Sequence, residues 1–192
     1  MIYTGNQEKK ADYYDQIYKD GYNTANYDVL YQEVINILSN LNNPRVLELG
    51  CGLGDLGKMI MEKNWQYRGF DFSQEAINIC KEKLPQGNFY LGNVYDNKSF
   101  GEDDYNTVIA LEVFEHVDDL SVIENIRPGA TVIGSVPDYD DSAHLRLYED
   151  GKTDIIDYYK PYMHVYDIRS AQIKNSGDTL TMHLFTGIKK AE

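Results

Sequence analysis

One stretch of ten residues, from Val46 to Asp55, constrains the fold of this chain more than any other part of it. It reads VLELGCGLGD, so an apolar run passes directly into a loop with three alternate glycines, and a helix-forming segment follows. Only glycine lets the backbone turn this tightly while approaching a ligand closely. The stretch therefore predicts a strand, a ligand-binding loop and a helix, which together open an α/β fold.

Strand-like and helix-like segments alternate after this point, which predicts a parallel sheet covered by helices. We expect strands at 45–49, 67–71, 89–91, 105–111 and 130–136, and helices at 55–63, 73–84 and 117–125. The tail alternates apolar and polar residues at 163–174 and 179–189 around Asn175-Ser-Gly-Asp178, which is typical of a hairpin. The expected fold is a Rossmann-like three-layer αβα sandwich whose seven-stranded sheet is mostly parallel, with a C-terminal antiparallel hairpin.

The segments outside this alternation suggest how the chain is organised. Residues 7–19 and 25–40 have helical spacing, so we expect 1–43 to form an N-terminal helical cap. Residues 44–192 would then form the α/β domain. Within it, residues 138–160 are rich in Asp and Tyr and weak in apolar periodicity. We interpret them as an excursion on the substrate side that could cover a ligand.

Charge and composition exclude some partners. The net charge of −13 would repel a phosphate backbone, so no nucleic acid is expected as a partner. No apolar run is long enough to span a bilayer, and the N-terminus lacks the apolar region of a signal peptide. Cys51 lies in the glycine loop and Cys80 on a predicted helix, which argues against a planned disulfide. These features together predict a cytoplasmic protein.

Two cofactors are compatible with the glycine loop. Gly52-x-Gly54-x-x-Gly57 matches the dinucleotide fingerprint, which alone is a weak signal. Glu48 precedes the first glycine by two residues and suits a cationic amino-acid ligand better than a pyrophosphate. The helical leader before the strand, and the lack of room for a separate substrate domain, point the same way. S-adenosylmethionine is therefore favoured over a nicotinamide dinucleotide.

The order of several motifs carries a family resemblance. The segment Glu48–Gly54 resembles motif I of the class I S-adenosylmethionine-dependent methyltransferases. Later segments resemble the family's following motifs in the same order: Gly69–Ser73, Gly92–Val94, Ile109–Glu112 and Arg127–Ala130. The resemblance covers about residues 45–137 and implies a methyltransferase with S-adenosylmethionine as its methyl donor.

The resemblance also implies which residues hold the cofactor. An acidic residue at the position of Asp71 accepts hydrogen bonds from the ribose hydroxyls in this family, and the end of the third strand contacts adenine. Asn93 stands where the family more commonly has Asp. The cofactor-binding residues expected are Glu48, Gly50, Cys51, Gly52, Gly54, Asp71, Phe72, Asn93, Val94 and Leu111.

A second group of polar residues follows the fourth strand, in the run LEVFEHV from Leu111 to Val117. If this run turns helically, Glu112, Glu115 and His116 share one face. Two carboxylates and an imidazole are costly to bury unless they are paired, solvated or bound to a cation. Such ligands suit Mg²⁺, Mn²⁺ or Zn²⁺.

This Glu-x-x-Glu-His pattern resembles the ubiquinone-biosynthesis O-methyltransferases. It also resembles the small-RNA 3′-end methyltransferases, where two glutamates and two histidines hold a divalent metal. His144 follows the fifth strand and could supply the second histidine, so the expected metal ligands are Glu112, Glu115, His116 and His144. Two other roles stay open for the set: acid/base or substrate-binding use without a metal, and structure alone.

The expected reaction is in-line methyl transfer to a hydroxyl oxygen of a small molecule. Protein or RNA methylation is the alternative, followed by an NAD-dependent oxidoreductase or a non-catalytic nucleotide-binding module. Arg146 could hold an anionic group or form a local ion pair. The catalytic residues expected are Glu115, His116 and His144, and the substrate contacts expected are Asp138, Arg146, Tyr18 and Tyr22.

Overall fold

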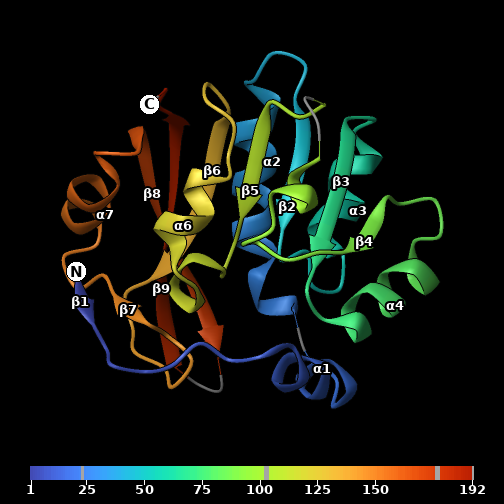
Figure 1. Cartoon of the computed structure of the whole chain (residues 1–192), viewed down its shortest axis with the longest axis horizontal. Helices are drawn as coiled ribbons and strands as arrows, with labels where there is room; N and C mark the ends of the chain where they lie inside the picture. The colour runs from blue at the N-terminus through green and yellow to red at the C-terminus, as the bar shows by residue number, and fades with distance from the viewer. Residues whose placement is uncertain (23, 102–103, 176–177, 192) are drawn as a thin grey trace.

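The computed structural model describes residues 1–22, 24–101, 104–175 and 178–191. Within them, the main sheet has seven strands in the order β4-β3-β2-β5-β6-β9-β8 (Figure 1). The strands are β2 (Arg45–Leu49), β3 (Gln66–Asp71), β4 (Phe89–Leu91), β5 (Thr107–Ala110), β6 (Thr131–Pro137), β8 (Met163–Asn175) and β9 (Asp178–Lys189). The first five pair in parallel, and β9 pairs antiparallel with both β6 and β8. The Rossmann-like fold expected from the sequence is confirmed.

Helices cover both faces of the sheet, as the three-layer prediction required. The helices on one face are α2 (Asp28–Ser39), α3 (Asp55–Glu62) and α4 (Gln74–Lys83), and those on the other are α5 (Asn97–Phe100), α6 (Asp119–Glu124) and α7 (Lys152–Tyr159). Strand β2 supplies both cores by alternation: Val46 packs with the first group, and Leu47 and Leu49 pack with the second. Such a strand reads as a continuous apolar run because both of its faces are buried.

The N-terminal segment runs across the carboxyl edge of the parallel strands. It contains β1 (Ile2–Tyr3), α1 (Ala11–Lys19) and the 3₁₀ turn η1 (Ala25–Tyr27), and Figure 1 shows α1 beside the lower end of α4. The Ser73 hydroxyl donates to Asp15 of α1 at 2.5 Å, and the Glu75 N–H donates to the same carboxylate at 3.1 Å. Helix α1 is therefore fixed to the start of α4 by two hydrogen bonds to one side chain.

The predicted excursion at 138–160 contains regular structure that the sequence did not reveal. Strand β7 (Arg146–Leu147) pairs antiparallel with β1, and α7 follows it. The predicted hairpin turn includes residues 176 and 177, which lie outside the described residues. None of the described helices is long and apolar enough to cross a membrane.

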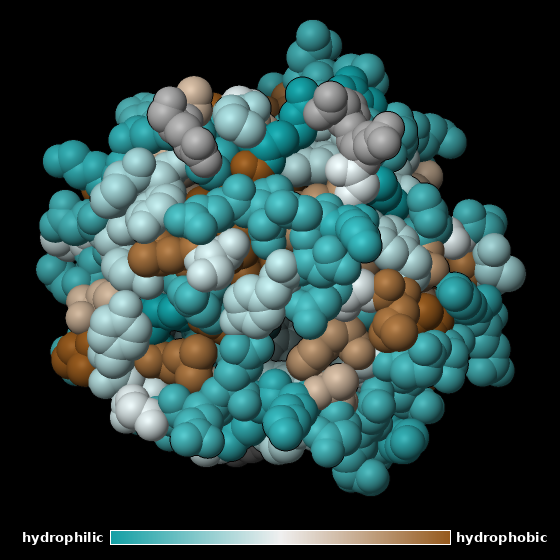
Figure 2. Space-filling view, viewed as in Figure 1, coloured by the Kyte–Doolittle hydropathy of each residue, from teal (hydrophilic) through white to brown (hydrophobic). Residues whose placement is uncertain are grey.

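The face of the molecule in Figure 2 is mainly hydrophilic. Figure 2 shows a face on which hydrophilic residues dominate and apolar residues lie in small groups. The apolar side chains are instead concentrated in the two buried layers on either side of the sheet.

Gly134 on β6 leaves room for two stacked phenylalanine rings against the sheet. It pairs in register with Phe185 of β9. A Cβ at position 134 would lie 2.4 Å from the Phe185 ring and 2.8 Å from the Phe114 ring. Phe114 begins the 3₁₀ turn η2 (Phe114–His116) and stacks on Phe185 with ring centroids 6.0 Å apart. The missing side chain therefore lets η2 pack close to the sheet.

We expect Gly134→Ala to destabilise the protein by about 1–3 kcal/mol, because the added methyl group overpacks this stack. Urea unfolding of the variant measures the loss. Phe185→Leu in the same chain should recover part of it, since the smaller side chain leaves room for the methyl group. Purely additive losses in the double-mutant cycle would contradict the steric explanation.

Candidate active site

The glycine loop after β2 adopts the conformation that its composition predicted. Gly50, Gly52 and Gly54 all have left-handed φ angles, of 66°, 50° and 77°. The loop is held by the Cys51 N–H, which donates to the Phe70 carbonyl at 3.0 Å. Gly57 serves another purpose, because a Cβ there would lie 2.5 Å from the Tyr67 ring. The fourth glycine therefore allows α3 to approach β3.

Asp71 connects the end of β3 to this loop. One carboxylate oxygen accepts from the Gly52 N–H at 3.0 Å, and the other accepts from the Ser73 N–H at 2.9 Å. The side chain is buried, and burial raises its pKa although the backbone N–H groups oppose the shift. Asp71 therefore organises the loop while its carboxylate also lines a cavity.

The first cavity has a volume of about 420 Å³ and lies at the ends of β3, β4 and β5. It contains five of the expected cofactor residues, Gly50, Asp71, Phe72, Asn93 and Val94. The Asn93 side-chain oxygen accepts from the Tyr95 N–H at 2.9 Å, which shapes the loop after β4. The cavity offers apolar walls for a flat ring and an acidic group for hydroxyls, which suits an adenosine.

The second cavity adjoins the first and has a volume of about 290 Å³. Its lining includes Glu48, Cys51, Gly52 and Leu111, the remaining expected cofactor residues apart from Gly54. Tyrosines form much of its wall: Tyr13, Tyr14, Tyr18, Tyr22, Tyr27, Tyr31 and Tyr139. None of the described residues that line it is Lys or Arg. The two cavities share Gly50, Tyr14, Tyr18, Glu112 and His116, so they form one continuous candidate site.

Three of the four expected metal ligands converge at this site. Glu115, His116 and His144 place one ligand atom each within 4.8 Å of one another. Glu115 is 0 % exposed, and neither of its carboxylate oxygens has a hydrogen-bond partner among the described residues. Glu115 Oε1 lies 3.9 Å from His116 Nε2. A buried carboxylate without a partner is costly, which makes a bound cation a natural complement.

Each imidazole has one nitrogen beside a backbone carbonyl, which leaves the other nitrogen available to a ligand. His116 Nδ1 lies 3.0 Å from the Ala143 carbonyl oxygen, and His144 Nδ1 lies 3.1 Å from the Tyr139 carbonyl oxygen. A carbonyl only accepts, so each Nδ1 carries the proton and each Nε2 keeps its lone pair. Burial lowers the pKa of His116 to about 4 and also lowers that of His144. Both rings are therefore neutral at pH 7, the form that binds metal ions.

Glu112 is not part of this group of three, although we expected it there. Its backbone has a left-handed φ of 54°, so it does not continue the turn that carries Glu115 and His116. The Ser135 hydroxyl donates to Glu112 Oε1 at 2.7 Å and accepts from the Glu112 N–H at 2.9 Å. Glu112 lines both cavities, and burial raises its pKa to about 7.

The expected substrate contacts divide into two groups. Tyr18 and Tyr22 line the second cavity. Asp138 is exposed and outside the lining of either cavity. Arg146 is 3 % exposed, also outside both linings, and its guanidinium forms an ion pair with Asp119 at 3.0 Å. For Arg146, the structure therefore shows the ion pair that the sequence left open as an alternative.

Two tyrosines join the site without having been expected individually. The Tyr14 ring packs 5.2 Å from Phe72 and 6.2 Å from the His116 ring, between the two cavities. The carbonyl of Tyr139 orients His144. The many tyrosines of the N-terminal segment are the one sequence feature that suggested a role for Tyr14. A contact made by a backbone carbonyl, as at Tyr139, has no signature in the sequence.

The parallel sheet, the glycine loop and an acidic residue ending the neighbouring strand together define the class I methyltransferase fold. The family described as methyltransferase domain matches residues 23–174. The chain therefore belongs to this family and is a class I S-adenosylmethionine-dependent methyltransferase domain. This assignment decides against the nicotinamide alternative.

Individual relatives are distant. The chain is 25% identical over 112 residues to the ubiquinone biosynthesis O-methyltransferase of Hydrogenovibrio crunogenus, covering 54% of this chain and 46% of that protein. It is 31% identical over 109 residues to an uncharacterized RNA methyltransferase of Clostridium acetobutylicum, covering 57% of this chain and 22% of that one. The chain thus spans less than half the length of either curated relative.

Similarity in structure extends further along the chain. Magnesium protoporphyrin IX methyltransferase from Synechocystis, solved with bound S-adenosylmethionine, aligns with a TM-score of 0.64 at 16% identity. The alignment covers 94% of this chain and 90% of that one. At this identity, the similarity establishes the fold.

We expect Asp71→Asn to weaken S-adenosylmethionine binding by about 10-fold to 100-fold, the usual range for losing a hydrogen bond to a charged group. Isothermal titration of the methyl donor measures this change. Asp104→Asn, which alters a half-exposed carboxylate outside both cavity linings, is the matched control. Equal affinities for the two variants would remove Asp71 from the donor site.

Glu48 provides a pH-dependent test of burial. Its pKa is raised by burial from 4.5 to about 8, although Tyr67 donates a hydrogen bond to it. Between these two values the unfolded chain releases a proton that the folded chain keeps, so folding stability falls as pH rises. The slope from this group is about 1.4 kcal/mol per pH unit.

Glu48→Gln should abolish this part of the pH dependence. Urea unfolding of the ligand-free protein at pH 4.5 and pH 8.5 should therefore show the variant gaining on the natural protein at the higher pH. A difference between the two proteins that stays constant with pH would mean that Glu48 ionises normally in the folded state.

Proposed function

We propose that this methyltransferase methylates a hydroxyl oxygen of a small uncharged molecule, and that Glu115, His116 and His144 hold a divalent cation beside the acceptor. The observation that carries the proposal is the buried Glu115 carboxylate, which has no partner among the described residues and faces two neutral imidazoles. A carboxylate with two imidazoles suits Mn²⁺ or Zn²⁺, and Mg²⁺ if water completes the shell.

The charges and side chains of the second cavity support an uncharged acceptor. Its lining contains the acids Glu48, Asp55, Glu112 and Asp141 and, among the described residues, no Lys or Arg. A phosphate or carboxylate group would find no cationic side chain there. Tyrosine rings offer flat apolar contacts, and their hydroxyls offer hydrogen bonds, which suits a hydroxylated ring or a sugar.

Each group at the site has a task in the proposed reaction. The acceptor oxygen attacks the methyl carbon, the carbon–sulfur bond breaks, and S-adenosylhomocysteine leaves. A divalent cation at the three ligands would lower the pKa of a hydroxyl that it contacts. Glu112 takes the hydroxyl proton in this proposal, because it lines both cavities and its pKa of about 7 suits a general base. The donor lies along the glycine loop with its adenosine in the first cavity.

Methylation of RNA is the second candidate, because one curated relative is named as an RNA methyltransferase. The net charge of −13 and the absence of Lys and Arg from the described lining of the second cavity oppose it. A panel of acceptors tests the choice by counting S-adenosylhomocysteine formed. Turnover with neutral polyols or phenols supports the proposal, and turnover confined to an oligonucleotide contradicts it.

The metal site is tested with Glu115→Gln, which replaces the buried carboxylate that has no partner among the described residues by a neutral side chain of nearly the same shape. We expect two opposite effects on the melting temperature. The metal-free variant should melt above the metal-free natural protein at pH 7, because burial raises the pKa of the Glu115 carboxyl and the natural protein must protonate or desolvate that group when it folds. Added Mn²⁺ should raise the melting temperature of the natural protein and leave the variant unchanged.

Glu82→Gln is the matched control, since it makes the same chemical change at an exposed position on α4. It should keep the full response to Mn²⁺, and EDTA should reverse that response. If the natural protein shows no stabilisation by Mn²⁺, Mg²⁺ or Zn²⁺, the metal part of the proposal fails.

A further inference from the structure

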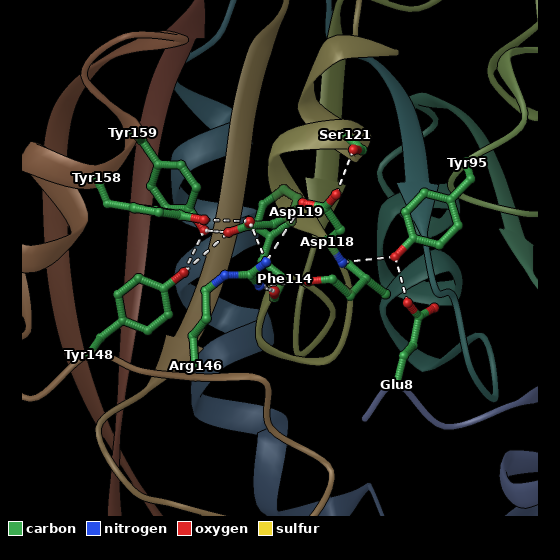
Figure 3. Close-up of polar contacts among 11 residues, drawn as sticks. Glu8, Tyr95, Phe114, Asp118, Asp119, Ser121, Arg146, Tyr148, Tyr158 and Tyr159 are labelled. Carbon is green, nitrogen blue, oxygen red and sulfur yellow. Dashed lines mark hydrogen bonds and ion pairs between the residues drawn. The ribbon is translucent and has the colours of Figure 1, made fainter. Parts of the chain in front are cut away.

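A buried polar cluster contacts Phe114 of η2, the turn that carries two of the proposed metal ligands (Figure 3). Its centre is Asp119 of α6, which is 0 % exposed and pairs with Arg146 of β7 at 3.0 Å. Three tyrosine hydroxyls donate to the same carboxylate: Tyr159 at 2.7 Å, Tyr158 at 3.0 Å and Tyr148 at 3.2 Å. So many donors on one carboxylate compensate it for leaving water.

Arg146 connects this cluster to η2, the turn that contains two of the proposed ligands. Its Nη1 donates to the Phe114 carbonyl at 3.0 Å and to the Val117 carbonyl at 2.6 Å. These two residues flank Glu115 and His116 in the chain. One guanidinium therefore fixes both ends of η2, whose single turn satisfies few of its own carbonyls.

The chain around Arg146 completes the connection. The Leu145 N–H donates to the Glu115 carbonyl at 2.7 Å, and His116 Nδ1 donates to the Ala143 carbonyl at 3.0 Å. His144 lies between these two bonds in the sequence. Hydrogen bonds from residues 143, 145 and 146 therefore connect this segment to η2 and to Val117, which follows it. The three proposed ligands lie on these two connected segments.

Asp119 also balances charge near the proposed cation. An unpaired guanidinium behind η2 would repel a divalent cation across a medium of low dielectric constant. Asp119 Oδ1 lies 3.0 Å from Arg146 Nη2, so the negative charge of the carboxylate offsets the positive charge of the guanidinium at short range. The pair places a nearly neutral unit behind Glu115.

We propose that Arg146 and Asp119 are positioning residues for the metal site: together they lock η2 against residues 143–146 and so set the separation of Glu115 from His116 and His144. This inference rests on the proposed function, because it takes those three residues as the metal ligands. The three tyrosines hold Asp119 in place and do not touch the site themselves.

Asp119→Asn tests the proposal because it removes the charge while keeping nearly the same shape. We expect Mn²⁺ affinity, measured by isothermal titration, to fall by about 10-fold to 100-fold, the usual loss when a residue supporting metal ligands is changed. The electron paramagnetic resonance spectrum of bound Mn²⁺ should change as well, because the ligand geometry changes. S-adenosylmethionine affinity should stay within about twofold, since neither Asp119 nor Arg146 lines either cavity.

Two further variants separate positioning from general stability. Tyr158→Phe removes one half-buried hydroxyl and keeps the ion pair, so it should fold and lose about threefold in Mn²⁺ affinity. Asp104→Asn breaks the ion pair with Arg68 elsewhere in the protein and should leave Mn²⁺ affinity and spectrum unchanged.

The outcomes distinguish this inference from the proposed function beneath it. If the natural protein binds Mn²⁺ and Asp119→Asn and Tyr158→Phe bind it equally well with the same spectrum, the positioning role is wrong and the metal site stands. Parallel losses of Mn²⁺ and S-adenosylmethionine affinity would also overturn the role, since they indicate general loosening. If the natural protein binds no divalent cation, both proposals fall.

Discussion

The parallel pairing of β2 with β3 and β5 is the constraint on which the whole site depends. Its register sets Leu49 beside Phe70 and Glu48 beside Ile109, so the three strands end at nearly the same level. The glycine loop follows β2, Asp71 ends β3, and the Glu112–His116 run follows β5, so these segments meet although they are distant in sequence. Parallel strands produce this convergence because each connection carries the chain back to the opposite end of the sheet before the next strand begins. The carboxyl ends of all the parallel strands therefore lie at one edge.

Beyond the strand ends, the polar groups of one loop must be satisfied by another, because regular hydrogen bonding stops there. Asp71 holds the Gly52 N–H, Ser135 holds Glu112, and Arg146 holds the carbonyls on either side of Glu115 and His116. Glu115 breaks this pattern among the described residues, since its backbone is bonded and its carboxylate is not. The buried Glu115 carboxyl group without a partner is the reason for proposing that it binds a ligand.

The sequence predicted what depends on local pattern. The strands that enter the sheet, the glycine loop and Asp71 all follow from apolar runs and turn chemistry, and the structure has them. The elements whose conformation depends on non-local contacts could not be predicted from the sequence. The β1–β7 pair joins two strands of two residues each, too short for any periodicity to show. Helix α7 has a weakly apolar face because its buried side chains include Tyr159, whose hydroxyl is satisfied by Asp119.

Glu112 shows the same limit within the site. Its helical spacing from Glu115 and His116 suggested a shared face, but Ser135 on the neighbouring strand draws Glu112 into a left-handed conformation. Such a conformation is costly for a residue other than glycine, so the surrounding structure must impose it. The consequence is a separation of tasks among two carboxylates only three residues apart. In the proposed reaction Glu115 completes the cation site, while Glu112 faces both cavities with a pKa near neutrality, the condition for a group that exchanges protons with an acceptor.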